Sequence, residues 1–390
     1  MTAPTSPRVF FYVQHLLGIG HLARASRIAN ALVNDGFHVT LVTGGLPVAG
    51  FPCPGIDHVA LPAMAVSDGD FSALVDAAGR PVDDAFRARR QADLLAAFRD
   101  ATPDVVLIEA YPFGRRQVRF ELRALIDAIE GTTPRPLLMT SLRDILQRRS
   151  KPARDEETVA VIRRHFDGVL VHGDQDFARL DDTFPLASDI ADRIHYTGLV
   201  CGPAPVPAPD RYEIVVSAGG GAVGAGVVAA ALDAARLLPE IASWCVIAGP
   251  NMPQGDFDRF RASAPEQVSL VRFRTDFPGL LVNAKVSVSQ AGYNTVGDIL
   301  QAGCRALLIP YCAGGETEQS DRAARLQQIG RATVLAEADL TGDGLAQAIQ
   351  RSLAQAPVRD APSLATQGAA RTAGILRTLL AASPTRSSAR

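Results

Sequence analysis

Residues 286–299 have the sequence VSVSQAGYNTVGDI and contain the clearest structural signal in this chain. Apolar and polar side chains alternate over residues 286–289, as in a β-strand, and a glycine-containing turn then leads into a helix that opens with Asn294 and Thr295. A second apolar strand at residues 306–310 runs into a polar loop at residues 314–319. Both loops follow the carboxyl ends of strands, where ligands bind to open α/β sheets. The segment therefore predicts an α/β fold with a ligand site at this edge.

The order of strand, glycine-rich turn, helix and strand occurs in two further places. The first copy occupies residues 8–13, 14–21, 22–35 and 37–42. The second copy occupies residues 212–217, 219–226, 227–238 and 244–248. Such units form right-handed parallel crossovers. We therefore expect two successive Rossmann-like halves, although the two copies share no close sequence repeat.

A composition break separates the two halves. Four prolines within seven residues, at positions 203, 205, 207 and 209, are typical of a stiff, extended connector. The remaining N-terminal strands are expected at residues 105–108, 136–139 and 168–171, and residues 63–90 are interpreted as an irregular excursion over the active face. We predict an N-terminal domain at residues 1–200, a linker at 201–211 and a C-terminal domain at 212–363. A final helix with a frayed tail is expected at residues 364–390.

Composition excludes several classes of protein. The 390 residues are 47% hydrophobic and 21% charged, which is typical of folded domains, and a formal charge of −2 gives no basic face for nucleic acid. Five dispersed cysteines without CxxC spacing favour free thiols in a reducing cytosol. There is no signal-peptide pattern and no apolar run of about 18 residues. We expect a cytoplasmic protein, and a peripheral contact with the inner face of a membrane stays open.

A dinucleotide-binding motif is the first interpretation to test. Gly219, Gly221 and Gly224 fit the GxGxxG pattern, but the NAD form of this motif also needs a carboxylate at the end of the next strand. The two corresponding strand ends, at residues 43–45 and 248–249, contain no acid. The pattern therefore favours a turn whose amides and helix N-terminus attract a diphosphate. A tight turn needed only for packing is the alternative.

Together these residues resemble the donor half-site of GT-B glycosyltransferases, especially the MurG-like branch. In that family an AG…TxxE turn holds the nucleotide, and a following loop with an acid or amide and Gln holds the sugar. The matching segments here are AGYNTVGD at residues 291–298 and ETEQ at residues 316–319, and GIGHLARA at residues 18–25 resembles the glycine-rich first loop with its histidine. The resemblance implies a GT-B fold, with two Rossmann-like, doubly wound parallel-sheet domains facing a cleft and the C-terminal helix packing back on the N-terminal domain.

The resemblance places donor binding in the C-terminal half. Its implied nucleotide and diphosphate contacts are Gly219, Gly220, Gly221, Gly224, Gly292, Asn294, Thr295 and Asp298. The family usually has Glu at the position of Asp298, and an acid that only complements the helix macrodipole is the alternative. The implied donor-sugar contacts are Glu316, Glu318 and Gln319. Gln319 is the strongest of these, since an amide can both donate to and accept from a sugar diol.

The N-terminal half is implied to bind the acceptor. His21 is the candidate general base, because imidazole titrates near neutral pH and a helix N-terminus disfavours its charged form. Glu109 is the second catalytic candidate, and His15 is a rival of His21. The residues expected on the acceptor side are Gly18, Gly20, Tyr111, Arg115 and Arg143. Capping and packing are the alternative roles for these residues.

The implied reaction is metal-independent, inverting transfer of a hexose-type sugar from an NDP-sugar, most simply a UDP-sugar, to an unidentified sugar, lipid-linked or polysaccharide acceptor. No cofactor is expected. The DxD-like segments at residues 68–70 and 174–176 are interpreted as a loop and a helix cap, and no His/Cys cluster has zinc spacing.

Other functions stay open on the same fold, because the site and not the fold decides the chemistry. The first alternative is an NDP-sugar hydrolase or 2-epimerase. The second is a nucleotide-sugar-binding protein without turnover. An NAD-dependent oxidoreductase is weakened by the two missing ribose acids.

Overall fold

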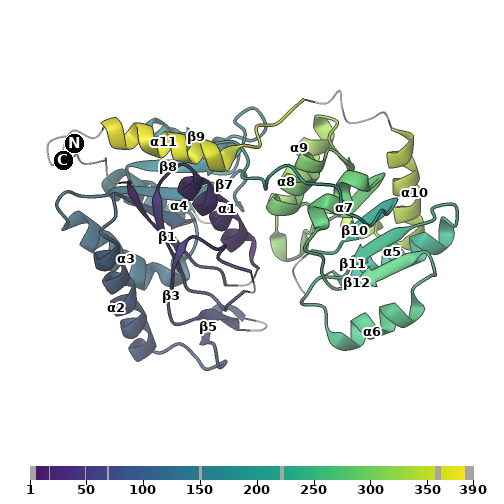
Figure 1. The fold of residues 1–390 in the computed structure, drawn as a ribbon, viewed down its shortest axis with the longest axis horizontal. Coiled ribbons are helices and arrows are strands. Elements are labelled where there is room, and N and C mark those ends of the chain that lie inside the picture. Colours follow the sequence, from purple (N-terminus) through teal and green to yellow (C-terminus); the bar gives the residue numbers. More distant parts are fainter. Residues whose placement is uncertain are drawn as a thin grey trace. The chain divides into compact units, whose positions relative to one another are not determined.

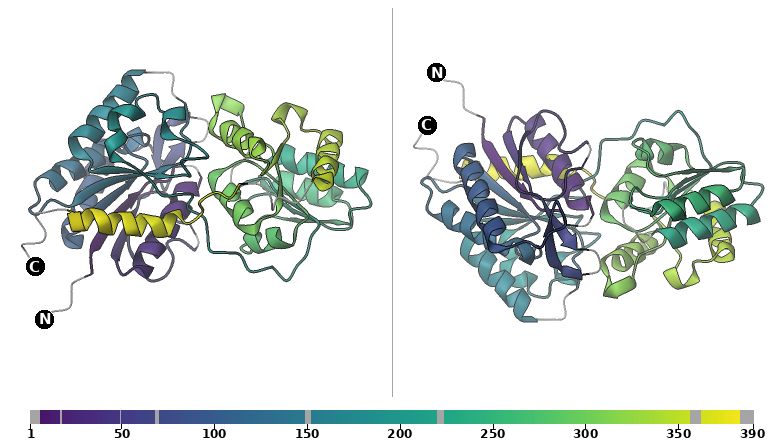
Figure 2. Two further views of the ribbon diagram at one scale, coloured as in Figure 1. Left: turned by 90° about the horizontal axis from the view of Figure 1, so that it is seen from above. Right: turned by 90° about the horizontal axis from the view of Figure 1, so that it is seen from below.

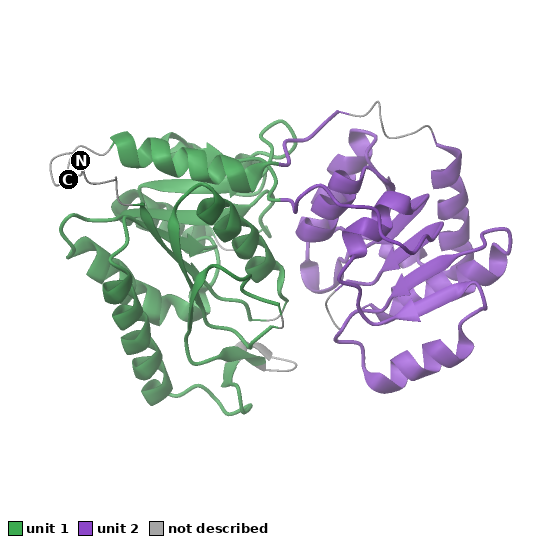
Figure 3. Cartoon of the chain, viewed as in Figure 1, with its two compact units in different colours: residues 1–200, 367–390 green, residues 201–366 purple. Residues whose placement is uncertain are grey.

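The computed structural model describes residues 6–16, 18–48, 50–67, 70–148, 152–219, 224–355 and 362–382 (Figure 1). The chain divides into two compact units (Figure 3). Unit 1 comprises residues 1–200 and 367–390, and unit 2 comprises residues 201–366.

Unit 1 is built on a parallel sheet whose strand order is β3-β2-β1-β6-β7-β8-β9. These strands are β1 (Arg8–Val13), β2 (His38–Thr43), β3 (Asp57–Ala60), β6 (Val105–Glu109), β7 (Leu137–Arg143), β8 (Gly168–His172) and β9 (Ile194–Tyr196). In β1, Phe10 and Tyr12 belong to the core on the side of α2 and α3, while α1 packs against the same strand. A strand covered on both faces has no polar side, which explains the continuous apolar run RVFFYV.

The helices of unit 1 lie on both faces of this sheet. They are α1 (Gly20–Asn34), α2 (Asp84–Ala101), α3 (Arg119–Glu130), α4 (Pro152–His165) and α11 (Gly368–Ala382), with short 3-10 helices at η1 (Arg116–Val118), η2 (Leu180–Asp182) and η3 (Ala187–Arg193).

The expectation of an irregular segment at residues 63–90 was wrong. This segment contains an antiparallel hairpin of β4 (Met64–Ser67) and β5 (Asp70–Asp76) and the first turns of α2. Arg90 is fully buried and donates to Glu121 at 2.7 Å and to the Gly44 carbonyl at 2.8 Å. Its charge made this helix appear exposed in the sequence, whereas a buried ion pair holds it against the sheet.

Unit 2 has a second parallel sheet, with strand order β12-β11-β10-β13-β14-β15. Its strands are β10 (Ile214–Ser217), β11 (Trp244–Ile247), β12 (Val268–Val271), β13 (Val286–Ser289), β14 (Arg305–Leu308) and β15 (Thr333–Val334). Its helices are α5 (Ala225–Leu237), α6 (Gln254–Ser263), α7 (Phe277–Asn283), α8 (Tyr293–Ala302), α9 (Glu318–Gln328) and α10 (Gly342–Ala354), with η4 (Ala313–Gly315) and η5 (Glu337–Asp339). The predicted strand–turn–helix unit at residues 286–299 is therefore β13, its turn and α8.

The last helix belongs to unit 1, as the resemblance implied. Helix α11 packs along α1 (Figure 2), and its Arg377 pairs with Asp35 and lies 4.8 Å from the centre of the Phe37 ring. Residue 368 must be glycine there, because a Cβ atom would lie 2.2 Å from the Gly198 carbonyl oxygen. The tail expected at residues 383–390 lies outside the described residues.

The proline-rich segment at residues 201–211 carries no regular element and packs on unit 2, where the Ala208 amide donates to the Gly279 carbonyl at 3.1 Å.

Each sheet changes its direction of growth once. In unit 1 the chain builds β2 and β3 on one side of β1 and then crosses to β6 on the other side; in unit 2 it crosses from β12 to β13 past β10. The carboxyl ends of β1 and β6, and those of β10 and β13, therefore flank the topological switch points at which open α/β sheets bind ligands.

Candidate active site

The switch point of unit 1 brings together the two predicted catalytic residues. His21 lies in the first turn of α1, just after β1, and Glu109 is the last residue of β6. The imidazole Nδ1 of His21 is 2.8 Å from the Glu109 Oε1 atom. Eighty-eight residues separate them in the chain, and they meet because parallel strands end at the same edge of a sheet.

Three side chains surround the Glu109 carboxylate, which is fully buried. Besides His21, Arg24 donates to Oε1, and Ser141 donates its hydroxyl to Oε2 at 2.6 Å. Burial raises the pKa of Glu109, but the charge of Arg24 and the hydrogen bonds from His21 and Ser141 outweigh it and hold the pKa well below its usual range. Glu109 is therefore an ionised acceptor at neutral pH.

The charge of Glu109 fixes the state of the His21 ring. Since an ionised carboxylate can only accept, the Nδ1 atom of His21 carries the proton. Burial and the nearby Arg115 guanidinium lower the pKa of His21 to about 3, against the opposing effect of Glu109. The ring is neutral, and its Nε2 lone pair makes no hydrogen bond within the described part of the chain. This is the state that a general base requires.

The hydrogen bonds continue inward from Glu109. The Ser141 hydroxyl has one proton, which it donates to Glu109, so it accepts from His172 Nε2 at 2.9 Å. His172 Nδ1 lies 2.9 Å from the oxygen of the Thr197 hydroxyl, which donates its proton to the Gly198 carbonyl at 2.8 Å. His172 is fully buried, and burial, together with the charge of Arg24, lowers its pKa to about 3. This chain of directed hydrogen bonds anchors the carboxylate that orients His21.

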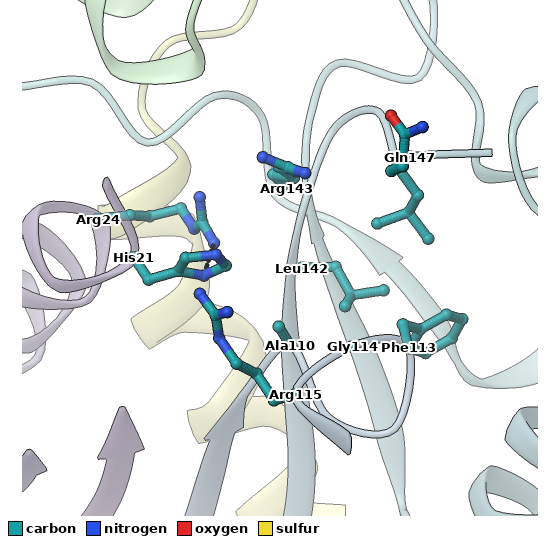
Figure 4. Close-up of a pocket in the computed structure, with 10 residues that line it drawn as sticks. His21, Arg24, Ala110, Phe113, Gly114, Arg115, Leu142, Arg143 and Gln147 are labelled. Atoms are coloured by element: carbon teal, nitrogen blue, oxygen red, sulfur yellow. Dashed lines mark hydrogen bonds between the residues drawn. The ribbon is translucent and has the colours of Figure 1, made fainter. Parts of the chain in front are cut away.

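A pocket of about 210 Å³ opens beside His21 (Figure 4). The described residues that line it are His21, Arg24, Ala110, Phe113, Gly114, Arg115, Leu142, Arg143, Leu146 and Gln147. Two predicted acceptor-side residues, Arg115 and Arg143, are among them. Tyr111 is not: it is 3% exposed and packs in the core with its ring centre 6.4 Å from that of Phe166. Its position directly after a strand placed it at the correct edge, but its side chain turns inward.

The predicted first loop contains the start of α1 and follows a rival histidine. Gly20 is the first residue of α1, whereas a Cβ atom at Gly18 would meet open space. His15, the rival base, lies outside the pocket lining and its Nε2 is 2.8 Å from the Leu46 carbonyl oxygen. The geometry therefore favours His21 over His15.

The switch point of unit 2 holds the starts of α5 and α8, which follow the neighbouring strands β10 and β13. Neither helix has a side-chain N-cap bond or an acid in its first turn. Gly219 adopts φ +84°, and a Cβ atom on Gly224 would lie 2.5 Å from that of Ala218, so this turn needs glycine at both positions. Gly220 and Gly221 lie outside the described residues.

The α8 start carries the remaining nucleotide candidates. Gly292 is its N-cap, and a Cβ atom there would meet open space. Asn294 and Thr295 lie in the first turn and Asp298 in the second, all half-buried. Exposed amides without a competing acid suit an anion.

The predicted sugar-binding residues differ in how many of their polar atoms already bond to other groups of the protein. The Gln319 side-chain oxygen accepts from the backbone amides of Ala291 and Tyr311 at 3.0 and 3.1 Å, so only its NH₂ group stays for a ligand. Glu318 is 5% exposed and pairs with the fully buried Arg322 at 2.8 Å. The Glu316 Oε1 atom is buried and has no hydrogen-bond partner in the described part of the chain.

Comparisons with known proteins show what this chain is similar to. Residues 215–375 match the glycosyltransferase family 28 C-terminal domain. The UDP-N-acetylglucosamine–N-acetylmuramyl-(pentapeptide) pyrophosphoryl-undecaprenol N-acetylglucosamine transferase of Desulfitobacterium hafniense is 34% identical over 85 residues, which are 22% of this chain and 23% of that protein. The Brucella anthropi protein of the same name is 26% identical over 153 residues, 38% of this chain and 40% of that one. The matched regions thus span less than half of these relatives.

Solved structures resemble the chain over nearly its whole length. MurG of Acinetobacter baumannii has a TM-score of 0.58 at 15% identity and covers 96% of this chain and 99% of its own. CalG4, the calicheamicin glycosyltransferase, has a TM-score of 0.62 at 16% identity and covers 97% and 99%. At such identity the likeness establishes the GT-B fold. The chain has a MurG-like GT-B glycosyltransferase fold with a family 28 C-terminal domain.

Several residues of this MurG-like glycosyltransferase site were missed by sequence reasoning. Arg24 lies three residues after His21 and so on the same helical face, which is a signal that was available. His172 and Thr197 carried no recognisable motif, because only the sheet brings them to Ser141.

No group of three or more His, Cys, Asp or Glu side chains in the part of the chain that the structure describes could hold a metal ion. Residues 68 and 69 of the first DxD-like segment lie outside the described residues. Asp174 accepts the Asp176 amide at 2.9 Å in a turn, and not in the helix cap we expected. Among the described helices, none is long and apolar enough to cross a membrane.

Proposed function

We propose that this protein transfers a hexose-type sugar from a nucleoside diphosphate sugar, most simply a UDP-sugar, to an acceptor hydroxyl with inversion and without a metal ion. The observation that carries the proposal is the neutral His21 ring. Its Nδ1–H is held by the ionised Glu109, which leaves the Nε2 lone pair available at the pocket of unit 1. No cofactor is needed for this chemistry.

In the proposed mechanism, His21 Nε2 takes the proton of the acceptor hydroxyl while that oxygen attacks the anomeric carbon. The new carbon–oxygen bond forms as the bond to the diphosphate breaks, and the nucleoside diphosphate leaves with the electron pair. Attack opposite to the leaving group inverts the anomeric centre. Glu109 stabilises the imidazolium that forms, much as a buried carboxylate does beside other catalytic histidines.

The donor is proposed to bind unit 2. The starts of α5 and α8 would hold the diphosphate through backbone amides, a role that a metal ion fills in other sites. Asp298 would accept hydrogen bonds from the ribose hydroxyls. For the sugar hydroxyls, the Glu316 oxygen and the Gln319 NH₂ group are the best-placed contacts, while the ion pair of Glu318 leaves that residue a smaller part.

The acceptor is proposed to be a hydroxylated sugar, either free, lipid-linked or in a polysaccharide. The named relatives transfer N-acetylglucosamine to a pyrophosphoryl-undecaprenol acceptor. These names support testing a lipid-linked acceptor. We propose in addition that the enzyme is cytoplasmic and in peripheral contact with the inner face of a membrane.

The first experiment measures nucleotide binding. We expect UDP to raise the melting temperature of the purified protein more than GDP, dTDP, ADP or NAD at equal concentration. Asp298→Ala should weaken UDP binding by about 1.5–3 kcal/mol if charge-assisted hydrogen bonds are lost. Asp343→Ala is the matched control, because it removes an exposed acid from the first turn of α10 in the same unit. Stabilisation by NAD alone would contradict the proposal.

The second experiment separates transfer from the alternatives. Candidate UDP-sugars are incubated with and without acceptors, and the products are identified by mass spectrometry and NMR. His21→Gln should lower turnover by about 10²–10⁴-fold with UDP affinity unchanged. Free sugar as the only product would assign a hydrolase, a rearranged sugar an epimerase, and tight binding without any product a nucleotide-sugar-binding protein.

A further inference from the structure

The pocket beside His21 is strongly cationic. Arg24, Arg115 and Arg143 line it from α1, from the loop after β6 and from the end of β7, and its described lining contains no acidic side chain. The Arg24 and Arg115 side chains point toward His21 (Figure 4). Arg24 is paired with Glu109, so its charge is already used within the protein. Arg115 differs.

Arg115 has no ion-pair partner in the described part of the chain, and its Nε atom is buried without a hydrogen-bond partner. Burial lowers its pKa to about 10, and the nearby Arg143 and Arg24 add to this against the attraction of Glu109. Its backbone also adopts the left-handed conformation, with φ +57°, which is strained for a residue with a side chain. Within the described part of the chain, the attraction of Glu109 offsets these unfavourable features only in part.

The neighbouring arginines show that the chain supplies partners where the fold needs them. Arg116 and Arg119, one and four residues further on, both pair with Glu157. Arg115 alone of the three points into the pocket and has no carboxylate partner. The missing partner is therefore expected from a ligand, because a desolvated guanidinium favours an oxyanion, such as a carboxylate or a phosphate, that it can bind through two hydrogen bonds.

We infer that the acceptor carries an oxyanion, a carboxylate or phosphate ester, close to the hydroxyl that is glycosylated, and that Arg115 binds it with Arg143. The inference rests on the proposed function for the identity of the acceptor. The apolar side chains of Phe113, Leu142 and Leu146 line the rest of the pocket and suit the carbon skeleton of that acceptor.

The oxyanion would also tune the catalytic base. After burial, the Arg115 charge is the main cause of the lowered pKa of His21. An anion bound to Arg115 compensates this charge and raises the pKa of His21 toward the operating pH, where a general base works best. A neutral acceptor leaves His21 a weak base, so the arrangement selects anionic acceptors at the chemical step as well as in binding.

Binding is tested without turnover by NMR of the arginine side chains in the full chain. Inorganic phosphate and acetate are the probes, and the Arg115 Nε–H signal is assigned by its loss in Arg115→Lys. We expect both probes to shift this signal saturably, and Arg115→Gln to weaken binding by about 10- to 100-fold. Arg116→Gln is the matched control, since it removes the same charge one residue away outside the pocket, and Asp298→Ala should also leave the shift intact. An unshifted Arg115 signal overturns the inference.

The acceptor class is tested with the donor that supports turnover. A neutral hexose, its uronic acid and its 6-phosphate form a matched series, and a polyprenyl-pyrophosphate-linked sugar in detergent separates a lipid source of the oxyanion from a soluble one. We expect kcat/KM to be at least about tenfold higher for the anionic members and to fall to that of the neutral hexose in Arg115→Gln.

Equal use of neutral and anionic acceptors would overturn the inference while the proposed function stands. Absence of transfer to any acceptor would instead count against the proposed function and leave the NMR result unaffected. If Arg115→Gln weakened UDP as much as Asp298→Ala does, the pocket would serve the donor diphosphate, and the inference would be wrong.

Discussion

The neutral histidines of the site predict that unit 1, but not unit 2, loses stability on mild acidification. All seven histidines lie between residues 15 and 195, in unit 1, and the sequence of unit 2 contains none. Between pH 7 and pH 5 histidine is the side chain whose ordinary pKa is crossed. Unit 2 therefore serves as an internal control, and we attribute a loss of stability that is confined to unit 1 to these histidines.

The sign and size follow from the shifted pKa values. A histidine whose pKa is lower in the folded than in the unfolded state takes up protons preferentially when unfolded, so stability falls as pH drops below about 6.5 and continues to fall until about pH 3. With folded-state pKa values of about 3, His21 and His172 should each cost about 2 kcal/mol between pH 7 and pH 5, or about 4 kcal/mol together. His172 is fully buried and the His21 side chain is 21% exposed, so solvent screening reduces the effect little.

Equilibrium unfolding in urea at pH 7 and pH 5 provides the assay. Trp244, the single tryptophan, is fully buried in β11 and reports unit 2, while circular dichroism reports both units. We expect the tryptophan transition to keep its midpoint and the other transition to move to lower urea. His172→Gln should reduce the loss of stability between pH 7 and pH 5 by about 2 kcal/mol. Equal stability of unit 1 at the two pH values would refute the neutral state of His21 on which the proposed base depends.

Three substitutions test the contacts around the two sites. Glu109→Gln should lower turnover by about 10²–10⁴-fold, because its amide can donate to His21 Nδ1 and move the ring proton to Nε2; unchanged kcat would remove Glu109 from the mechanism. Ser141→Ala should cost about 1–3 kcal/mol in unit 1 through a lost hydrogen bond to an ionised carboxylate, measured by urea unfolding, and a loss confined to unit 2 would contradict this. Arg322→Ala should lower the free energy of unfolding of unit 2 by about 3–5 kcal/mol, because it leaves the buried Glu318 without its cation. The double variant Glu318→Gln/Arg322→Met should recover most of this loss, as measured by the tryptophan transition.

The fold was largely predictable because its signals are local and redundant. Strand β1 was predicted with its observed bounds, and the strands at residues 105–108 and 168–171 were each one residue too short. Buried parallel strands are continuous apolar runs, so they stand out against amphipathic helices. The hairpin of β4 and β5 was missed, because its pairing depends on contacts between strands and because Asp and Gly residues interrupt its short apolar runs.

The sequence predicted the candidate site only to the extent that the ends of the strands identify the ligand-binding edge of the sheet. That rule brought His21 and Glu109 together, since both follow central strands. It could not give the direction of a side chain, and Tyr111 turned inward at the same edge. Nor could it reveal that Glu318 is neutralised by Arg322, because the pairing depends on burial as well as on a spacing of four residues.

The helix starts give an independent reason to assign anions to both switch points. An acid in the first turn of a helix contributes about 0.3–1 kcal/mol, and the helices after β6, β7, β11 and β15 each carry one, namely Glu121, Asp155, Asp256 and Asp343. The helices α1, α5 and α8 carry none, and they follow β1, β10 and β13 at the switch points. Helices α7 and α11 also lack an acid there, so its absence alone is not specific. What distinguishes α1, α5 and α8 is that their starts coincide with the switch points.

Helix α9 provides the contrast. It starts after β14, beside that edge, with Glu318 and Asp321 in its first turn, and a start of this kind repels a phosphate but can accept hydrogen bonds from a neutral sugar. In unit 2 the ends proposed to bind the anion and the sugar thus differ in charge. In unit 1 the acid-free start of α1 lies beside Arg115, where the same reasoning requires an anion on the acceptor.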